Sequence, residues 1–268
     1  MPAVRPAAVA GQFYPGDAGA LAAEVSSYLA EVPAPGPGVR APKAIIAPHA
    51  GYIYSGPIAA SIYARLAPLR GTIRRVILVG PAHRVHVAGV AVPTSHAFAS
   101  PLGEVPLDLA TIEMLRRKLP FVEVSDRAHA HEHSLEVHLP FLQSVLGSFE
   151  LVPIVVGDAP PDDMAHLLEL VWGGPETLLV VSSDMSHYLP YNSALGRDRQ
   201  TARAIASLEA NVALEEACGA APINGLLLAA RGKGLRCELV DLRNSGDTAG
   251  DLDRVVGYGA FAFTEPDA

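Results

Sequence analysis

Histidines and aspartates follow the short apolar runs of this sequence, within a few residues of the point where each run ends. They are His49, His83, Asp158, Asp184 and His187. Neutral imidazole and carboxylate are the ligand set of non-haem divalent metal sites, and two histidines with one acidic residue leave positions open for substrate or oxygen. His49 and His83 are therefore the first candidate metal ligands. One isolated histidine would more often cap a strand end, but three at equivalent positions favour a shared site.

Residues 182–187 (SSDMSH) allow two kinds of chemistry. In a hydrolase, Ser183 and His187 could meet on a helical turn, but the segment has no GxSxG elbow, and a strand-to-helix cap explains the serines better. Asp184 and His187 suit a general acid/base pair above a metal, because histidine titrates near neutrality and a carboxylate fixes its tautomer. We expect His49, His83 and His187 to line one pocket.

Residues 129–138 (HAHEHSLEVH) hold four of the ten histidines. The HExxH motif of zinc proteases is excluded, because it requires a second histidine four residues after His131, where the chain has Leu135. We expect His129 and His131 to lie in an exposed loop. Two roles remain possible for His133, Glu136 and His138. These residues could orient a metal ligand or contact substrate, or they could be purely structural.

Residues 244–251 (NSGDTAGD) follow a predicted strand. The carboxylate of Asp247 could reach a ligand, although NSGD is also ordinary turn chemistry.

Cys237 lies within an apolar strand and is expected to be buried and unreactive. Cys218 precedes a glycine and is also expected to be a small buried residue.

The elements that position these residues follow from hydrophobic periodicity. Continuous apolar runs are typical of strands buried on both faces; they are Ala44 to Ala47, Val76 to Val79, Leu151 to Val156 and Leu178 to Val181. Segments with helical spacing alternate with them, near residues 18–31, 57–69, 107–119, 135–146, 162–171 and 193–208. Residues 235–242 and 255–263 add strands, the second antiparallel or at an edge. This alternation predicts one α/β domain over residues 1–268, with three layers and a mainly parallel central sheet between helices. Ligands of such sheets bind beyond the carboxyl ends of the strands.

Composition limits the classes of function. The chain has 268 residues, half of them hydrophobic, and a formal net charge of -8, so it has no general attraction to phosphate backbones, and nucleic acid is not expected as a partner. Cys218 and Cys237 cannot form a disulfide framework. No apolar run approaches the length of a membrane span, so we expect a cytoplasmic protein without a membrane partner.

Taken together, six motifs spread along the chain resemble the Memo family, whose prokaryotic members are also called AmmeMemoRadiSam system protein B. They are RPAAVAGQFYP from Arg5, APHAGYIYSG from Ala47, VGPAHR from Val79, EHSLEVHLPFL from Glu132, SSDMSHY from Ser182 and RNSGDTAGD from Arg243. The resemblance runs from Arg5 to about Phe263. It implies a fold similar to class III extradiol dioxygenases of the LigB type.

The resemblance also implies a site and partners. His49 and His83 fall on the two histidine metal ligands of the family, and Asp184 and His187 fall on its pocket pair, with His187 placed like the acid/base histidine of the dioxygenases. Eukaryotic members add a cysteine ligand where this chain has Thr248. The metal implied is iron or copper, with zinc as an alternative. The implied partners are AMMECR1-domain and radical SAM proteins.

Two functions remain open at this point. One is a metal-dependent oxidoreductase acting on an unknown small molecule, with His49, His83 and a third group holding the metal and His187 moving protons. The other is a non-catalytic protein that uses the same pocket to dock a peptide or a partner enzyme. For the third ligand, we expect His187 or Asp184 to complete the site before Asp247.

Overall fold

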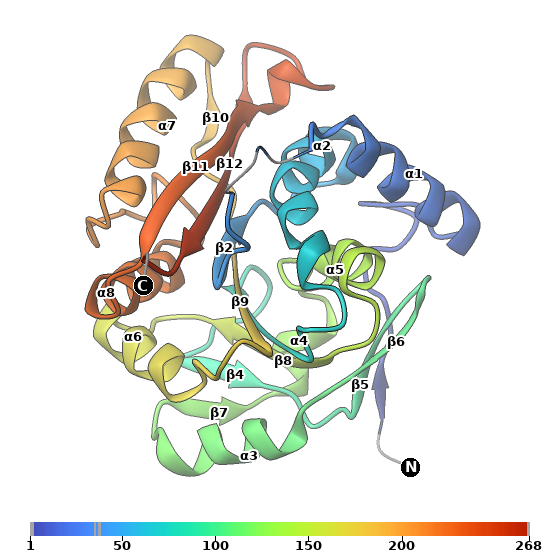
Figure 1. Cartoon of the computed structure of the whole chain (residues 1–268), viewed down its shortest axis with the longest axis vertical. Helices are drawn as coiled ribbons and strands as arrows, with labels where there is room; N and C mark the ends of the chain where they lie inside the picture. The colour runs from blue at the N-terminus through green and yellow to red at the C-terminus, as the bar shows by residue number, and fades with distance from the viewer. Residues whose placement is uncertain (1–2, 35, 37–38, 267–268) are drawn as a thin grey trace.

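A mixed nine-stranded sheet is the centre of the computed structural model, which describes residues 3–34, 36 and 39–266 (Figure 1). Its strands are β2 (Ala44–Ala47), β3 (Arg75–Pro81), β4 (Val90–Val92), β7 (Val122–Val124), β8 (Glu150–Val156), β9 (Thr177–Ser182), β10 (His187–Leu189), β11 (Arg236–Asn244) and β12 (Val255–Thr264). Their order is β10-β12-β2-β9-β3-β8-β4-β7, and β11 pairs with β12. A smaller sheet joins β1 (Val4–Arg5), β5 (Ala97–Ser100) and β6 (Gly103–Pro106).

The four predicted apolar runs form the parallel middle of the large sheet. β2, β9, β3 and β8 are neighbours and all pair in parallel. All four residues of β2 and all six of β9 are buried. Continuous apolar sequence is expected for strands that are covered on both faces.

The prediction of a mainly parallel sheet is wrong, because the sheet is mixed, although the prediction of an antiparallel or edge strand over residues 255–263 is confirmed by β12. β12 is antiparallel to β2, β10 and β11, and β4 is antiparallel to β8. β11 and β12 are joined by a short connection, which can link only antiparallel neighbours. β4, β7 and β10 have three residues each, too few to leave a periodic signal in the sequence.

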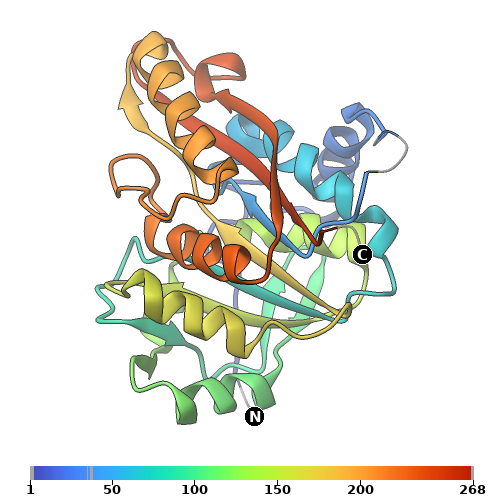
Figure 2. The same ribbon diagram turned by 60° about the vertical axis from the view of Figure 1, so that its left-hand side comes forward.

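Helices cover both faces of the sheet (Figure 1). One group consists of α1 (Ala18–Glu31), α2 (Tyr52–Tyr63) and α5 (Leu139–Leu146), and the other of α6 (Pro161–Leu170), α7 (Tyr191–Ala206) and α8 (Ala220–Gly232). Figure 2 shows α6 and α8 side by side. Shorter elements are α3 (Leu109–Lys118), α4 (Asp126–Ala130) and the 3-10 helices η1 (Ala64–Leu69), η2 (Glu136–His138) and η3 (Ser245–Asp247). One apolar core joins strands to helices of both groups, as Ile58 of α2 and Leu227 of α8 illustrate.

A buried carboxylate fastens the N-terminal segment to the histidine-rich segment. Glu136 is fully buried and pairs with Arg5, and it also accepts hydrogen bonds from the backbone N–H groups of Ala8 and Val9 and the hydroxyl of Tyr14. Burying a carboxylate is costly unless such partners satisfy it. Glu136 therefore has a structural role, which is one of the options left open by the sequence.

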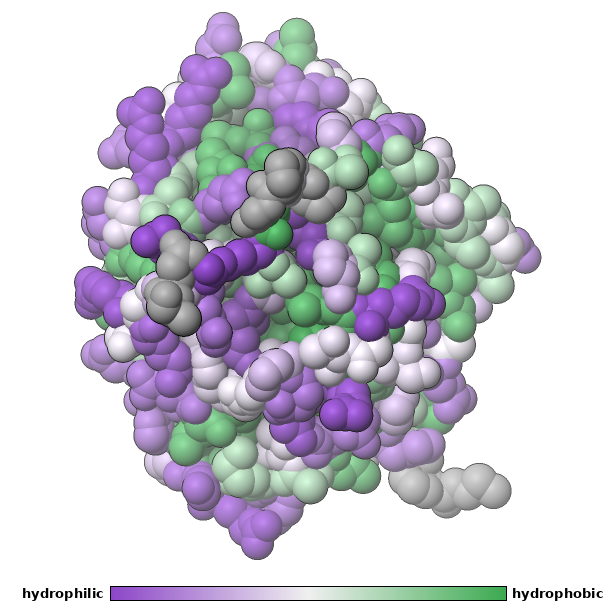
Figure 3. All heavy atoms as spheres, viewed as in Figure 1, coloured by the Kyte–Doolittle hydropathy of each residue, from purple (hydrophilic) through white to green (hydrophobic). Residues whose placement is uncertain are grey.

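The outer surface is mixed in character. In the face shown in Figure 3, hydrophobic and hydrophilic residues are interspersed. None of the described helices is long and apolar enough to cross a membrane.

Candidate metal centre

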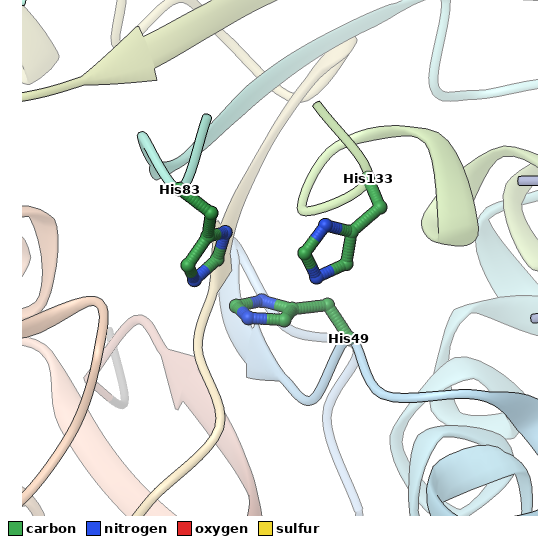
Figure 4. A group of neighbouring side chains, drawn as sticks. All are labelled: His49, His83 and His133. Carbon is green, nitrogen blue, oxygen red and sulfur yellow. The ribbon is translucent and has the colours of Figure 1, made fainter. Parts of the chain in front are cut away.

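Three histidines from three separate segments converge at the carboxyl ends of the central strands (Figure 4). His49 lies two residues after β2, His83 lies two residues after β3, and His133 lies between α4 and η2. The ring centroids are 5.1 Å apart for His49 and His83, 4.8 Å for His83 and His133, and 5.5 Å for His49 and His133. One ring nitrogen of each lies within 4.8 Å of the others. The three side chains are therefore close enough to bind one ion together.

The His49 side chain is buried and held from two directions. Its Nδ1 is hydrogen-bonded to Oγ of Ser182 at 2.6 Å, and its backbone N–H donates to Oδ1 of Asp184 at 2.7 Å. Burial, and then the neighbouring histidines, keep the pKa of His49 well below its ordinary value. His49 is therefore a neutral imidazole, which is the form that binds metals.

Glu132 orients His83. Its two carboxylate oxygens accept the backbone N–H of His83 at 2.6 Å and Nδ1 of His83 at 2.9 Å. Burial of Glu132 opposes its ionisation, but the hydrogen bonds that Glu132 accepts from His83 and Ser134 outweigh burial and lower the pKa of Glu132 to about 2. A carboxylate that accepts one ring N–H of a histidine leaves the other nitrogen free to bind metal.

His133 has an unsatisfied buried nitrogen. Its Nδ1 is 3.4 Å from Oε1 of Glu132, yet it makes no hydrogen bond among the described residues. Burial lowers the pKa of His133 to about 4, so the ring is neutral. Buried polar atoms nearly always have a hydrogen-bond partner. A buried histidine nitrogen without one, in a cluster of imidazoles, is consistent with a metal ligand. The donor set therefore fits a divalent first-row ion.

A cavity of about 600 Å³ opens beside the three histidines. The four residues predicted as metal ligands or as the acid/base pair line it, namely His49, His83, Asp184 and His187, whereas Asp158 does not. Cavities of this size hold small molecules. His187, exposed on β10, lies outside the group of three histidines, so its role as a metal ligand stays a prediction.

Asp184 is the carboxyl group of the cavity. Burial raises its pKa to about 7, and the backbone N–H groups of His49 and Ala50 oppose that rise only in part. Asp184 can therefore exchange a proton near neutral pH. The pKa of His187 is lowered, mainly by loss of solvation of its ring.

The structure also places residues whose roles the sequence did not settle. His133 joins the cluster, and the only sequence signal for it is the HEH run that begins at His131. His131 is exposed as predicted, but the prediction for His129 is wrong, because its ring is buried and its Nε2 is 3.0 Å from the carbonyl oxygen of Ala91. A short helix, α4, turns His129 inward.

The residues after β11 have turn roles. Asp247 accepts hydrogen bonds from the backbone N–H of Asn244 and the hydroxyl of Tyr191, and it forms a capping box with Asn244. The hydroxyl of Thr248 donates to the carbonyl oxygen of Ser245. Neither Asp247 nor Thr248 is among the residues that line the cavity.

The two cysteines lie in different surroundings. Cys237 of β11 is partly buried, and burial raises its pKa to about 12. Cys218 is also partly buried, but its Sγ is 3.3 Å from Nε2 of His49. Nothing in the sequence indicates that contact, because 169 residues separate the two positions.

Comparisons with known proteins agree over almost the whole chain. A family model described as Memo-like protein matches residues 5–262. A MEMO1 family protein of Ignicoccus hospitalis is 37% identical over 285 residues, covering 98% of this chain and 99% of the relative. One from Aquifex aeolicus is 36% identical, covering 95% and 97%, and one from Sulfolobus acidocaldarius is 34% identical with the same coverage. The chain therefore belongs to the Memo family.

Proposed function

We propose that this Memo-family protein binds a divalent iron or copper ion through His49, His83 and His133 and uses it in redox chemistry on a small molecule. The observation that carries the proposal is the convergence of three imidazole side chains, two of which have their other nitrogen held by a hydrogen bond. Imidazole suits iron, copper and zinc. The family resemblance favours iron or copper, with zinc as the alternative. Such an ion would supply one-electron redox chemistry and an open position for substrate.

The chain itself would supply proton transfer beside the ion. His187 and Asp184 line the same cavity, and the pKa of Asp184 is about 7. A group that titrates near the working pH is suited to general acid/base catalysis. We assign proton transfer to this pair, as in the dioxygenase-like pocket that the family resemblance implies.

The cavity wall suits a small anionic molecule with an aromatic or apolar part. Arg84 and Arg254 line it, and neither has an ion-pair partner among the described residues. The guanidinium of Arg254 lies 5.0 Å from the ring centroid of Tyr188. Tyr188 has a φ of +58°, a conformation that bulky residues rarely adopt, beside an irregularity in the pairing of β10. Strain of this kind often accompanies a functional site.

A second function rests on the same wall. Tyr54 and Tyr188 are large side chains at the cavity, 38% and 61% exposed. Exposed aromatic residues beside a pocket also suit docking of a peptide or a partner enzyme. AMMECR1-domain and radical SAM proteins are the partners that the family resemblance suggests.

Cys218 and Cys237 are both free, which suits a reducing compartment such as the cytoplasm.

Metal analysis tests the proposal. Protein purified without oxygen is expected to contain, or to take up, about one iron or copper ion per chain. His49→Ala, His83→Ala and His133→Ala are each expected to abolish stoichiometric uptake. The matched control is His86→Ala, which removes an exposed histidine three residues from His83. Uptake that survives all three substitutions would contradict the metal site and favour the docking function.

A further inference from the structure

A chain of buried hydrogen bonds leads from His49 away from the cavity. Nδ1 of His49 is 2.6 Å from Oγ of Ser182, and the same oxygen is 2.8 Å from Nε2 of His138. Nδ1 of His138 is 2.8 Å from the hydroxyl oxygen of Tyr63. All four residues are almost fully buried. We call Tyr63, His138 and Ser182 the relay.

The position of one proton follows from the contacts of Ser182. Its Oγ also lies 2.5 Å from the backbone carbonyl oxygen of Ser134, which can only accept a hydrogen bond. Two oxygens at that distance need a proton between them, so the Ser182 hydroxyl donates to Ser134. The hydroxyl has no second proton. His49 and His138 must therefore both donate to it, His49 from Nδ1 and His138 from Nε2.

Both histidines are neutral, so each carries only that one ring proton. Both rings are almost fully buried, at 2% and 1% exposed, and a charged imidazole would be costly to bury there. Nδ1 of His138 then has a lone pair, which accepts the hydroxyl proton of Tyr63. Nε2 of His49 has a lone pair as well. Every proton along the relay is assigned without leaving a donor or acceptor of the relay unpaired.

We propose that the relay holds His49 as its Nδ1–H tautomer, so that the lone pair of Nε2 is available to the metal site. Ser182, His138 and Tyr63 are positioning residues in this assignment, and none of them lines the cavity. The link to metal affinity rests on the proposed function, whereas the tautomer itself does not.

The two ligand histidines are thus oriented by different means. Glu132 is a charged acceptor for Nδ1 of His83, whose side chain is 28% exposed. His49 is fully buried beside Asp184, where a second carboxylate would be costly to desolvate and would favour protonation of the imidazole. A neutral hydroxyl fixes the tautomer without adding a charge, and the contacts of that hydroxyl with the carbonyl oxygen of Ser134 and with His138 hold it in one direction.

Long-range ¹H–¹⁵N NMR of the histidine side chains tests the tautomer in metal-free protein. In the wild type, Nδ1 of His49 is expected to carry the proton and Nε2 to show the shift of an unprotonated nitrogen. Ser182→Ala removes the acceptor, so His49 is expected to become a mixture of tautomers. Tyr63→Phe is expected to produce a smaller shift in the same direction. A wild-type proton on Nε2, or a Ser182→Ala spectrum identical to wild type, would overturn the proposal.

Tyr52→Phe is the matched control. Tyr52 is also a buried tyrosine, but its hydroxyl donates to the carbonyl oxygen of Val137, outside the relay. The tautomer of His49 is expected to remain as in wild type in this variant, and denaturation by urea checks that all variants fold. Equal effects of Tyr63→Phe and Tyr52→Phe would remove Tyr63 from the relay.

Metal titration of the same proteins separates the two proposals. Loss of a partner that orients a ligand typically lowers metal affinity about 10- to 100-fold, and this is the loss expected for Ser182→Ala, with a several-fold loss for Tyr63→Phe. Wild-type affinity in Ser182→Ala would overturn the relay while leaving the metal site intact. A wild type with the assigned tautomer but no metal uptake would overturn the metal site and leave the tautomer assignment standing.

Discussion

The thiol of Cys218 lies 3.3 Å from Nε2 of His49, the nitrogen that faces the metal centre. Burial raises the pKa of Cys218 to about 12, so the thiol keeps its proton and can donate it to that nitrogen. In the structure Cys218 stands beside the three-histidine cluster without belonging to it. An ion at Nε2 would take the place of this thiol hydrogen bond.

Cys218→Ala is accordingly expected to bind metal at least as tightly as the wild type. A protonated thiol is a poor ligand, and its removal eliminates a competitor for the lone pair of His49. Metal titration measures the affinity, and Cys237→Ala is the control for removing a partly buried cysteine elsewhere. A tenfold or larger loss of affinity in Cys218→Ala would mean that the thiolate binds the ion.

Glu132→Gln is expected to weaken metal binding by about 10- to 100-fold. Glu132 accepts both the backbone N–H and Nδ1 of His83, and an amide group cannot accept at both of its ends. The fixed orientation of the His83 ring is lost as a result. Metal titration is the measurement, with Glu113→Gln, an exposed position on α3, as control. Wild-type affinity in Glu132→Gln would show that His83 needs no such partner.

Asp247→Asn should leave metal binding unchanged and lower stability. Asp247 completes the capping box of η3 by accepting the backbone N–H of Asn244, it also accepts the hydroxyl of Tyr191, and it does not line the cavity. Loss of a capping side chain costs about 1 kcal/mol. Urea denaturation gives the stability, and metal titration gives the affinity. Weakened metal binding in a folded Asp247→Asn protein would place this carboxylate in the metal site, against our expectation.

The stability of the protein is expected to fall as the pH drops from 7 to 5, and His129 contributes to the fall. Burial lowers the pKa of His129 to about 4 from its ordinary value near 6.5. Between these pH values the unfolded chain binds more protons at His129 than the folded chain does. The contribution of His129 to the free energy of unfolding is therefore complete above pH 6.5 and is lost as the pH falls towards 4. The expected contribution of His129 between pH 7 and 5 is roughly 2 kcal/mol.

Between pH 7 and 5, the free energy of unfolding of His129→Gln should therefore fall by about 2 kcal/mol less than that of the wild type. The measurement is urea denaturation at the two pH values. His86→Gln, at an exposed histidine, is expected to behave as the wild type does. Equal pH dependence in His129→Gln and wild type would show that another group causes the loss.

Arg254→Met is expected to weaken binding of an anionic aromatic probe. Benzoate should bind in the cavity more tightly than benzamide, its neutral analogue, because Arg254 and Arg84 line the wall without ion-pair partners among the described residues. The loss expected in the variant is about three- to tenfold, since the arginine is exposed. Ligand-observed NMR measures the binding, and Arg117→Met on α3 is the control. Equal binding of both probes would argue against an anionic substrate.

Local sequence determined the elements that depend on local interactions. The helix predicted over residues 18–31 has those bounds in the structure, because Asp17 caps its first turn through the backbone N–H of Ala20. The four continuous apolar runs became the parallel strands of the middle of the sheet. The placement of His49 and His83 at one cavity also followed from sequence, since parallel strands end at the same edge of a sheet.

Tertiary structure alone decided the antiparallel pairing of β4 with β8, the addition of β10 to the sheet and the remaining members of the site. Strands of three residues carry no periodic signal, so β4, β7 and β10 form only where longer strands offer them an edge. His133 reaches the other two histidines because Arg5 and Glu136 fasten its segment to the N-terminal strand. The contacts of His49 with Ser182 and Cys218 span more than 130 residues. Such contacts depend on how distant segments pack, and spacing along the chain contains no record of that packing.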